Sequence, residues 1–347
     1  MKIGIYNPYL DTLGGHERYC FDIASCLSGD HDIDIFWDDP EILDRAIERF
    51  HIDLIGINLV KNIWRRGNMF AKAYQTRKYD VIFFVSDGSI PFVFSKKVFL
   101  LFEFPVPWVN GKSFINSIKV RRVTKIICNS SFVKEYIDGT FGVDSHVLTP
   151  GVDVDSFPPA KKEKLIISVG RFTTGMNTKK QHVLIDVFKK LGAKGWKLVL
   201  AGGMLESDSA FVEKLQKLAR KYPIEILPNI SFRDLQSLYA RASIYWHAAG
   251  FEEDLVGHPE RAEHFGISTV EAMSAGAVPV VYGGGGQKGI VGNWVNGFLW
   301  QTAEELIHRT RELIENQKTW SRFSKAAQMR AKDFSKARFC REVQSLW

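Results

Sequence analysis

The sequence is poor in cysteine and in long apolar runs. Its four cysteines, Cys20, Cys26, Cys128 and Cys340, lie far apart and form no CxxC pair. That spacing predicts neither a disulfide framework nor a zinc ribbon, and it is typical of a reducing compartment. The most apolar region, residues 81–109, is broken by charged side chains and offers no run of ~20 apolar residues, so we expect no membrane span.

The sequence also lacks the pattern of a signal peptide and a dinucleotide-binding motif. The opening decapeptide MKIGIYNPYL has only a short apolar stretch and no small-residue cleavage site, which predicts a first β-strand rather than a signal peptide. The glycines that follow it do not form GxGxxG, which argues against a dinucleotide-binding fingerprint. With 45% hydrophobic and 24% charged residues, the composition excludes a disordered or fibrous chain. We therefore expect a globular, cytoplasmic protein.

The net charge of +7 is unevenly placed. Residues 1–150 carry 18 Lys and Arg against 18 Asp and Glu, so the second half carries the whole excess. A basic half suits a polyanionic ligand, such as a nucleotide diphosphate, a nucleic acid or an anionic membrane surface. Within the balanced half, KSFINSIKVRRVTK at residues 112–125 is basic and partly amphipathic. It either rests on an anionic membrane or forms a solvated helix with one packed face.

Short apolar runs alternate with amphipathic helical patterns along the chain, which indicates βαβ units and mostly parallel sheets. A segment dense in Pro, Gly and Asp, residues 149–159, interrupts this alternation and marks a linker. We therefore expect an α/β protein with two Rossmann-like domains facing a central cleft, residues 1–150 and 151–325. Residues 326–347 are expected to cross back onto the N-terminal domain. The expected strands are residues 2–6, 32–36, 54–58, 80–85, 97–102, 125–129, 165–170, 197–201, 225–227, 244–247 and 277–282.

In open α/β sheets, ligands bind beyond the carboxyl ends of the strands, near helix N-termini. After the first strand, Gly14 and Gly15 directly precede a helix. They either let the backbone approach an anion closely or form a plain loop-to-helix turn. After strand 165–170 come Arg171 and Lys179, which either neutralise a diphosphate together or are solvated surface cations.

The most informative stretch is EHFGISTVEAM, in which Glu263 and Glu271 stand eight positions apart around a glycine turn and a helix start. Carboxylates suit hydroxyl-rich ligands because each offers several acceptor sites, so Glu271 would bind a ribose and Glu263 a sugar. In the alternative, Ser268 and Glu271 form a capping box, and Glu271 merely caps its own helix.

A metal site is a competing interpretation. Asp38-Asp39 and Asp153-x-Asp155 invite a metal-binding reading, but solvated turn carboxylates explain both. Three histidines and two glutamates also crowd one segment, but their spacing matches no HExxH pattern. We expect no metal. The residues of that segment are His247, His258, Glu260, Glu263 and His264.

Taken together, these motifs resemble the retaining glycosyltransferases of family 4, which have the GT-B fold. EHFGISTVEAMSAGAVPVV is similar to their E-x7-E signature, and GGHER resembles their N-terminal glycine loop. PGVDVDSF resembles the interdomain segment, SVGRF with Lys179 the Arg/Lys phosphate pair, and GGGGQKGIV with NGFLW the last loop. The resemblance covers most of the chain, and EHFGI in particular is similar to mannosyltransferases that extend lipid-linked oligosaccharides.

The resemblance implies a role for each matched residue. Arg171 and Lys179 would bind the donor diphosphate and stabilise the negative charge that grows on it as it leaves. Glu271 would bind the ribose and Glu263 the transferred sugar. The Gly14-Gly15 loop would line the donor side of the cleft. The sugar would also contact backbone N–H groups of Phe265, Gly266, Ile267 and Ser268.

Three features depart from the family pattern or extend it. These enzymes often carry a histidine near the reacting sugar, after a strand of the N-terminal domain. Here that strand ends in FEFP, and Glu103 either takes the place of the histidine as a catalytic group or is structural. The last loop usually reads GGxxE, but Gly289 stands where the glutamate is expected. Residues 252–263 form a polar insertion that we expect at the cleft rim, as an acceptor contact or a lid.

The resemblance implies an enzyme that moves a hexose from a nucleotide-diphosphate sugar to a hydroxyl of a glycan or lipid-linked acceptor, with retention. GDP-mannose is weakly preferred as the donor, and no metal or other cofactor is expected. A peripheral membrane contact is left open, and no nucleic acid is expected as a partner. The alternatives are a GT-B sugar-nucleotide epimerase and a basic protein that binds nucleotides or membrane surfaces without transferase activity.

Overall fold

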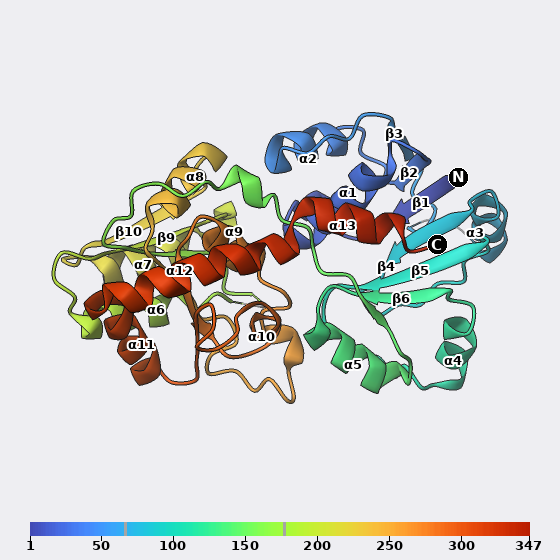
Figure 1. Ribbon diagram of the computed structural model, residues 1–347. Coiled ribbons are helices and arrows are strands. Elements are labelled where there is room, and N and C mark those ends of the chain that lie inside the picture. The colour runs from blue at the N-terminus through green and yellow to red at the C-terminus, as the bar shows by residue number, and fades with distance from the viewer. Residues whose placement is uncertain (66–67, 176–177) are drawn as a thin grey trace. The chain divides into compact units, whose positions relative to one another are not determined.

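The computed structural model describes residues 1–65, 68–175 and 178–347, without the side chain of Met69. The chain folds into two compact units (Figure 1). Unit 1 comprises Met1–Gly151 and Ala337–Trp347, and unit 2 comprises Val152–Lys336. The chain therefore returns to unit 1 at Ala337, whereas residue 326, where the sequence suggested a boundary, lies inside helix α12 (Gln317–Ala331) of unit 2.

Unit 1 is built on a seven-stranded parallel sheet in the order β3-β2-β1-β4-β5-β6-β7. Helices lie between its strands in sequence, as in βαβ units, and α13 joins it from the C-terminus. The strands are β1 (Lys2–Tyr6), β2 (Asp32–Phe36), β3 (Ile57–Val60), β4 (Val81–Val85), β5 (Lys97–Phe102), β6 (Lys125–Cys128) and β7 (His146–Val147). The helices are α1 (Gly15–Leu27), α2 (Ile42–Phe50), α3 (Met69–Thr76), α4 (Phe114–Val120), α5 (Ser131–Phe141) and α13 (Lys336–Gln344).

The central strand β4 shows why this sheet is covered on both faces. All five of its residues, VIFFV, are buried, which is typical of a parallel sheet between two layers of helices. Since successive side chains point to opposite faces, Phe83 packs in a core with α1 and α13, whereas Phe84 packs in a core with α5. The sheet is thus packed on both faces, and the loops at the carboxyl ends of its strands remain available for binding.

Unit 2 repeats this architecture with a six-stranded parallel sheet in the order β10-β9-β8-β11-β12-β13. One of its cores packs α8, α9 and α12 on the sheet, and another packs α6, α7 and α11 on it. The strands are β8 (Leu165–Val169), β9 (Lys197–Gly202), β10 (Ile224–Pro228), β11 (Ile244–His247), β12 (Val278–Tyr282) and β13 (Phe298–Trp300). The helices are α6 (Gln181–Leu191), α7 (Ser209–Ala219), α8 (Phe232–Arg241), α9 (Ile267–Ser274), α10 (Gln287–Ile290), α11 (Ala303–Glu315) and α12.

These sheets confirm the predicted α/β class and nearly all the predicted strands. The prediction of residues 54–58 was displaced, because Ile55 and Gly56 form a turn before β3 and Ile55 is exposed. The short edge strands β7 and β13 were not predicted. Among the described residues, no helix is long and apolar enough to cross a membrane.

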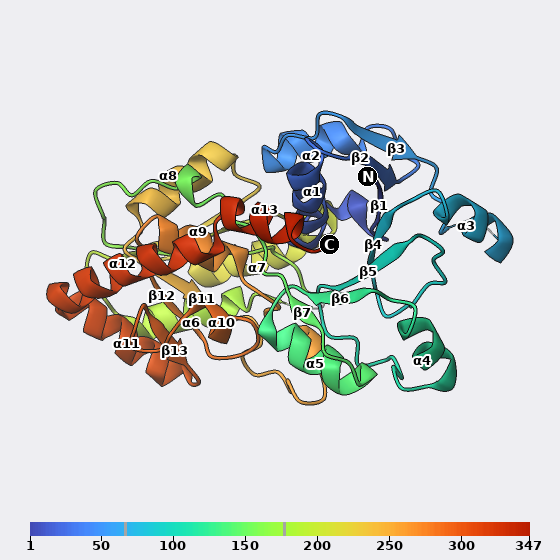
Figure 2. The ribbon, with the colours of Figure 1, turned by 45° about the vertical axis from the view of Figure 1, so that its right-hand side comes forward.

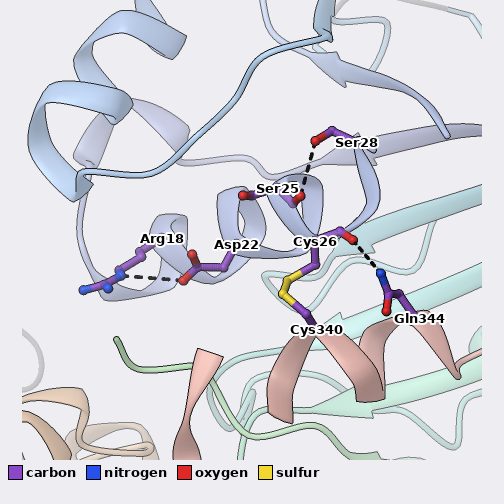
Figure 3. Close-up of a disulfide and its surroundings, with 7 residues drawn as sticks. All are labelled: Arg18, Asp22, Ser25, Cys26, Ser28, Cys340 and Gln344. Atoms are coloured by element: carbon purple, nitrogen blue, oxygen red, sulfur yellow. Dashed lines mark hydrogen bonds and ion pairs between the residues drawn. A yellow bond between two sulfur atoms is a disulfide. The ribbon is translucent and has the colours of Figure 1, made fainter. Parts of the chain in front are cut away.

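The cysteine spacing predicted no disulfide framework and a reducing compartment, yet one pair of cysteines is bonded. Cys26 of α1 and Cys340 of α13 are bonded across a sequence separation of 314 residues (Figure 3). The pairing arises because the C-terminal helix packs beside α1, where Gln344 also donates a hydrogen bond to the carbonyl oxygen of Cys26. Local cysteine spacing cannot reveal a contact between the two ends of a chain. Cys20 and Cys128 are buried thiols.

We predict that this disulfide stabilises unit 1 against unfolding. A cross-link between distant residues restricts the unfolded chain, and its removal should cost about 2–5 kcal/mol. Cys340→Ser, or reduction of the wild-type protein by dithiothreitol, should therefore lower the thermal midpoint of unit 1. Dithiothreitol should have no further effect on Cys340→Ser. Equal midpoints for the oxidised and reduced wild-type protein would refute the prediction.

Candidate active site

The candidate site lies where several strands of unit 2 end. Arg171 follows β8, His247 is the last residue of β11, and the segment after β11 leads through Glu263 to the start of α9. In a parallel sheet, the carboxyl ends of all strands meet at one edge. The sequence therefore places basic, acidic and imidazole groups together at this edge, beside a helix N-terminus.

Glu263 is the centre of this cluster. Its Oε2 atom lies 2.8 Å from Nζ of Lys179 and 2.7 Å from Nε2 of His247. Burial alone would raise the pKa of Glu263, but the charge of Lys179 and the hydrogen bond from His247 outweigh it and hold this pKa well below its usual range. Glu263 is therefore a carboxylate at neutral pH, fixed from two sides.

His247 holds the Glu263 carboxylate in place, and its imidazole ring is neutral. Its side chain is buried, and burial lowers its pKa below 6.5 although the hydrogen bond with Glu263 opposes the shift. A neutral imidazole carries one proton, and the short contact with the Glu263 carboxylate places that proton on Nε2. His247 thus donates to Glu263, a role that the sequence did not suggest, since we considered this histidine only as a metal ligand.

Arg171 lies near the same cluster. Its side chain is exposed, while its carbonyl oxygen accepts a hydrogen bond of 2.9 Å from Gln181 at the start of α6. Burial, against the opposing charge of Glu263 and with smaller contributions from the charges of Lys179 and Arg171, lowers the pKa of His264 to about 4. Both predicted phosphate-binding cations are therefore close enough to the His264 ring to affect its pKa. Residues 176–177, in the loop between these cations, lie outside the described residues.

Glu271 does not form the capping box that the sequence allowed. Helix α9 begins at Ile267 with Gly266 as its N-cap, so Ser268 stands inside the helix and its hydroxyl pairs with Tyr245 at 2.8 Å. The buried Glu271 carboxylate instead accepts a hydrogen bond of 3.0 Å from the Tyr239 hydroxyl. The N–H groups at the start of α9 carry no side-chain cap and suit an anion.

The glycine run 283–286 packs on the backbone of Glu263. Gly285 has a φ of 60°, and a Cβ atom there would lie 2.2 Å from the carbonyl oxygen of Glu263. The Gly286 N–H donates a 2.7 Å hydrogen bond to that same oxygen. Only glycine permits this approach, so the loop fixes the backbone of Glu263. At Gly289, by contrast, a Cβ atom would meet nothing within 4 Å, so the family glutamate is missing without a steric reason.

The polar insertion is tied to the start of α6 by ion pairs. Glu253 accepts from Lys180 at 2.5 Å and from Arg261 at 3.0 Å, and Lys180 lies next to Lys179. Two of the histidines considered as metal ligands contact Glu260 of the same segment: His258 pairs with its carboxylate at 3.1 Å, and His264 with its carbonyl oxygen at 2.9 Å.

The predicted residues of unit 1 lie at the carboxyl edge of its own sheet. Gly14 is the N-cap of α1, and its N–H donates to Glu17 at 2.7 Å. Glu103 follows β5 and is 1% exposed, and Oε2 of its carboxyl has no hydrogen-bond partner among the described residues. Burial, aided by the charge of Glu17, raises the pKa of Glu103 well above its usual range. A carboxyl that stays protonated can donate a hydrogen bond but cannot act as a base.

Comparisons with known proteins agree with this architecture. Residues 153–330 match the family described as "Glycosyl transferases group 1", and residues 13–156 match "Glycosyltransferase Family 4". Among solved structures, a glycosyltransferase from Rickettsia africae superposes with a TM-score of 0.77 at 18% identity, over 100% of this chain and 99% of that one. Anabaena HepE in complex with UDP-glucose gives 0.74 at 20% identity, over 99% and 98% of the two chains.

The fold and the family matches thus define a glycosyltransferase of the GT-B class. This chain belongs to the group 1 glycosyltransferases, with an N-terminal region of family 4. It is related to the GDP-Man:Man(3)GlcNAc(2)-PP-Dol alpha-1,2-mannosyltransferase of Dictyostelium discoideum, at 27% identity over 273 residues. That match covers 66% of this chain and 52% of the relative, so the chain spans about half the length of the relative.

We predict that Glu103 is neutral in the folded protein. In the unfolded chain it ionises above its ordinary pKa of 4.5, whereas in the folded state it keeps its proton. The folded state then binds the extra proton, and stability falls as the pH rises. Glu103→Gln should abolish this contribution and raise the free energy of unfolding at pH 8 by roughly 1 kcal/mol or more.

The thermal midpoint measured from pH 5 to pH 8 tests this prediction. Glu103→Gln should show a flatter decline than the wild type, and Glu135→Gln, on an exposed position of α5, should follow the wild type. If Glu103→Gln lowers the midpoint equally at every pH, Glu103 is ionised in the folded protein, contrary to the prediction.

Proposed function

We propose that this enzyme transfers a hexose from a nucleoside-diphosphate sugar to a hydroxyl of a glycan or lipid-linked acceptor, with retention and without a metal. The observation that carries the proposal is the Glu263 carboxylate, held by Lys179 and His247 at the strand ends of unit 2. A fixed carboxylate beside an uncapped helix N-terminus and two cations suits a ligand with hydroxyls at one end and a diphosphate at the other.

The diphosphate is the part of the donor that needs the strongest electrostatic support. As the bond between sugar and phosphate breaks, negative charge grows on the leaving group, and fixed cations and N–H groups lower the energy of that state. Arg171, Lys179 and the N–H groups of residues 265–268 are assigned this role. They supply the positive charge that a divalent cation supplies elsewhere, which is why we propose a metal-independent reaction.

Glu263 and Glu271 are assigned to the hydroxyls of the donor. Glu263 would accept from the transferred sugar with the lone pairs that Lys179 and His247 leave open, and Glu271 would accept from the ribose. Because both carboxylates are held by protein donors, we assign both to hydroxyl binding and neither to a covalent sugar intermediate. Retention then requires attack on the face that the phosphate leaves, and a phosphate oxygen would take the proton of the acceptor hydroxyl.

The likeness to mannosyltransferases supports GDP-mannose as the donor. The relative from Dictyostelium discoideum is named for GDP-mannose, whereas Anabaena HepE was crystallised with UDP-glucose. A guanine and a uracil nucleotide are therefore the two donors to compare. The acceptor of the same relative is a dolichol-linked oligosaccharide by its name, which supports a glycan or lipid-linked acceptor here.

Thermal stability with added nucleotides tests the proposal. GDP, UDP, ADP and NAD are added separately, each with and without EDTA. A ligand at about 100 times its Kd should add about 2.7 kcal/mol to the stability of the state that binds it. We expect one nucleoside diphosphate, GDP above all, to raise the thermal midpoint equally with and without EDTA. Stabilisation that EDTA abolishes, or by NAD alone, would contradict the proposal.

Matched variants locate the site in the same assay. Arg171→Ala should abolish stabilisation by the diphosphate, while Arg220→Ala, which removes an exposed cation after α7, should leave it intact. Glu263→Gln should weaken binding of the nucleotide sugar more than binding of the free diphosphate. If Arg171→Ala binds the diphosphate as the wild type does, the phosphate assignment is wrong.

A further inference from the structure

Large apolar side chains are exposed on two short helices of unit 1. On α4, Phe114 is 81% exposed and Ile115 is 62% exposed, and Ile118 is exposed as well. On α3, Phe70 and Tyr74 are about equally exposed, at 81% and 80%. Both views show α3 and α4 on the same side of unit 1 (Figures 1 and 2). Exposed apolar groups gathered in this way mark an interaction surface more often than singly scattered ones do.

Helix α4 presents these side chains on one side. Ile118 lies three positions after Ile115 and four after Phe114, a spacing that places all three on one helix face. None of the seven residues of α4 is buried, although Ser113 caps the helix at its N-terminus. A helix of this length gains little stability by itself in water and usually forms because one face is packed. Val120 of α4 packs on the core of unit 1, which leaves the exposed apolar face available for a contact outside that core.

The residues around this apolar face are basic. Residues 108–125 contain five lysines and arginines and no aspartate or glutamate, although the first 150 residues as a whole are balanced in charge. Lys112, Arg121 and Arg122 have exposed side chains. This stretch of the surface thus combines outward apolar groups with neighbouring cations, a pattern that suits an anionic surface with an apolar interior.

Aromatic rings join the basic residues of α3 and α4. The guanidinium of Arg122, just after α4, lies 5.0 Å from the ring centre of Phe94, and that of Arg77, just after α3, lies 5.7 Å from the same ring. Lys119 lies 5.2 Å from the ring centre of Phe92. Because the cation after each helix lies near the same ring, the C-terminal ends of α3 and α4 adjoin, and we treat their exposed residues together as one face. We call it the α3–α4 face: Phe70, Tyr74, Phe114, Ile115, Ile118, Arg77, Lys112, Lys119, Arg121 and Arg122.

We propose that the α3–α4 face docks on an anionic membrane surface. Phe114, Ile115 and Ile118 enter the boundary between headgroups and acyl chains, and the cations bind the anionic headgroups. A second copy of the chain is a poor partner for this face, because a symmetric contact would bring the two sets of cations together. Nucleic acid is a poorer fit, because bases could stack on Phe70, Tyr74 and Phe114 but would leave the aliphatic Ile115 and Ile118 without an apolar partner. Docking extends the proposed function without depending on it, since donor binding is assigned to unit 2.

Flotation with lipid vesicles tests the docking. Vesicles of phosphatidylcholine with 30 mol% phosphatidylglycerol are compared with vesicles of phosphatidylcholine alone, at low and at high salt. We expect the protein to float with the anionic vesicles and to be released as the salt screens its cations. Flotation with both vesicle types alike, or with neither at low salt, would overturn the proposal.

Two variants separate the apolar and basic contributions. Phe114→Ser with Ile115→Ser should weaken binding to anionic vesicles about tenfold or more, because both side chains leave the interface. Lys119→Gln with Arg121→Gln and Arg122→Gln should weaken it by a similar factor and remove the preference for anionic lipid. Two control variants on exposed positions of unit 2 should bind as the wild type does: Leu205→Ser with Val295→Ser, and Lys214→Gln with Lys217→Gln and Arg220→Gln.

Two readouts distinguish this proposal from its alternatives. All four variants should keep the stabilisation by a nucleoside diphosphate, so a loss of vesicle binding is not a loss of fold or of the donor site. Sedimentation of the wild type without lipid should show no dimer that depends on the α3–α4 face, that is, none that the double variant Phe114→Ser with Ile115→Ser would dissociate. Such a dimer, or control variants that lose vesicle binding to the same extent, would overturn the proposal. So would binding of a single-stranded oligonucleotide that anionic vesicles fail to displace.

Discussion

The pairing of Glu263 with Lys179 and His247 is the interaction on which the chemistry of unit 2 depends. A carboxylate in this position loses most of its hydration, and burial alone would favour its neutral form. One cation and one N–H donor on the same oxygen reverse that balance. Removing either partner from a largely buried ion pair would cost roughly 3–5 kcal/mol. The carboxylate therefore stays charged and in place, ready to orient a hydroxyl-rich ligand.

Backbone geometry maintains this pairing as firmly as the side chains do. The glycine run packs directly on the Glu263 carbonyl, and Gly266, with a φ of 121°, turns the chain into α9. Because α9 starts immediately after this turn, its N–H groups lie within a few residues of the carboxylate. The carboxylate and the helix N-terminus are thereby fixed by one short segment and one loop. Such a fixed arrangement of charged and N–H groups is preorganised, which is what the stabilisation of a leaving diphosphate requires.

Much of this could be predicted from the sequence, for physical reasons. Buried parallel strands such as β4 are continuous apolar runs, and the motif around Glu263 combines a glycine turn with a helix start. What could not be predicted depends on contacts between distant residues. The hydrogen bond from His247 to Glu263 spans 16 positions, and that from Tyr239 to Glu271 spans 32. The Cys26–Cys340 disulfide joins the two ends of the chain, and the protonation of Glu103 depends on burial, which local sequence does not report.

A crystal structure of the protein with a nucleoside diphosphate bound is the most direct test of the central claim. We expect the diphosphate beside Arg171 and Lys179, facing the N-terminus of α9, and the ribose within hydrogen-bond distance of Glu271. We also expect Glu263 to keep its contacts with Lys179 and His247 in the complex. A nucleotide bound at another edge of either sheet, or a diphosphate held by a metal ion away from Arg171, would contradict this claim.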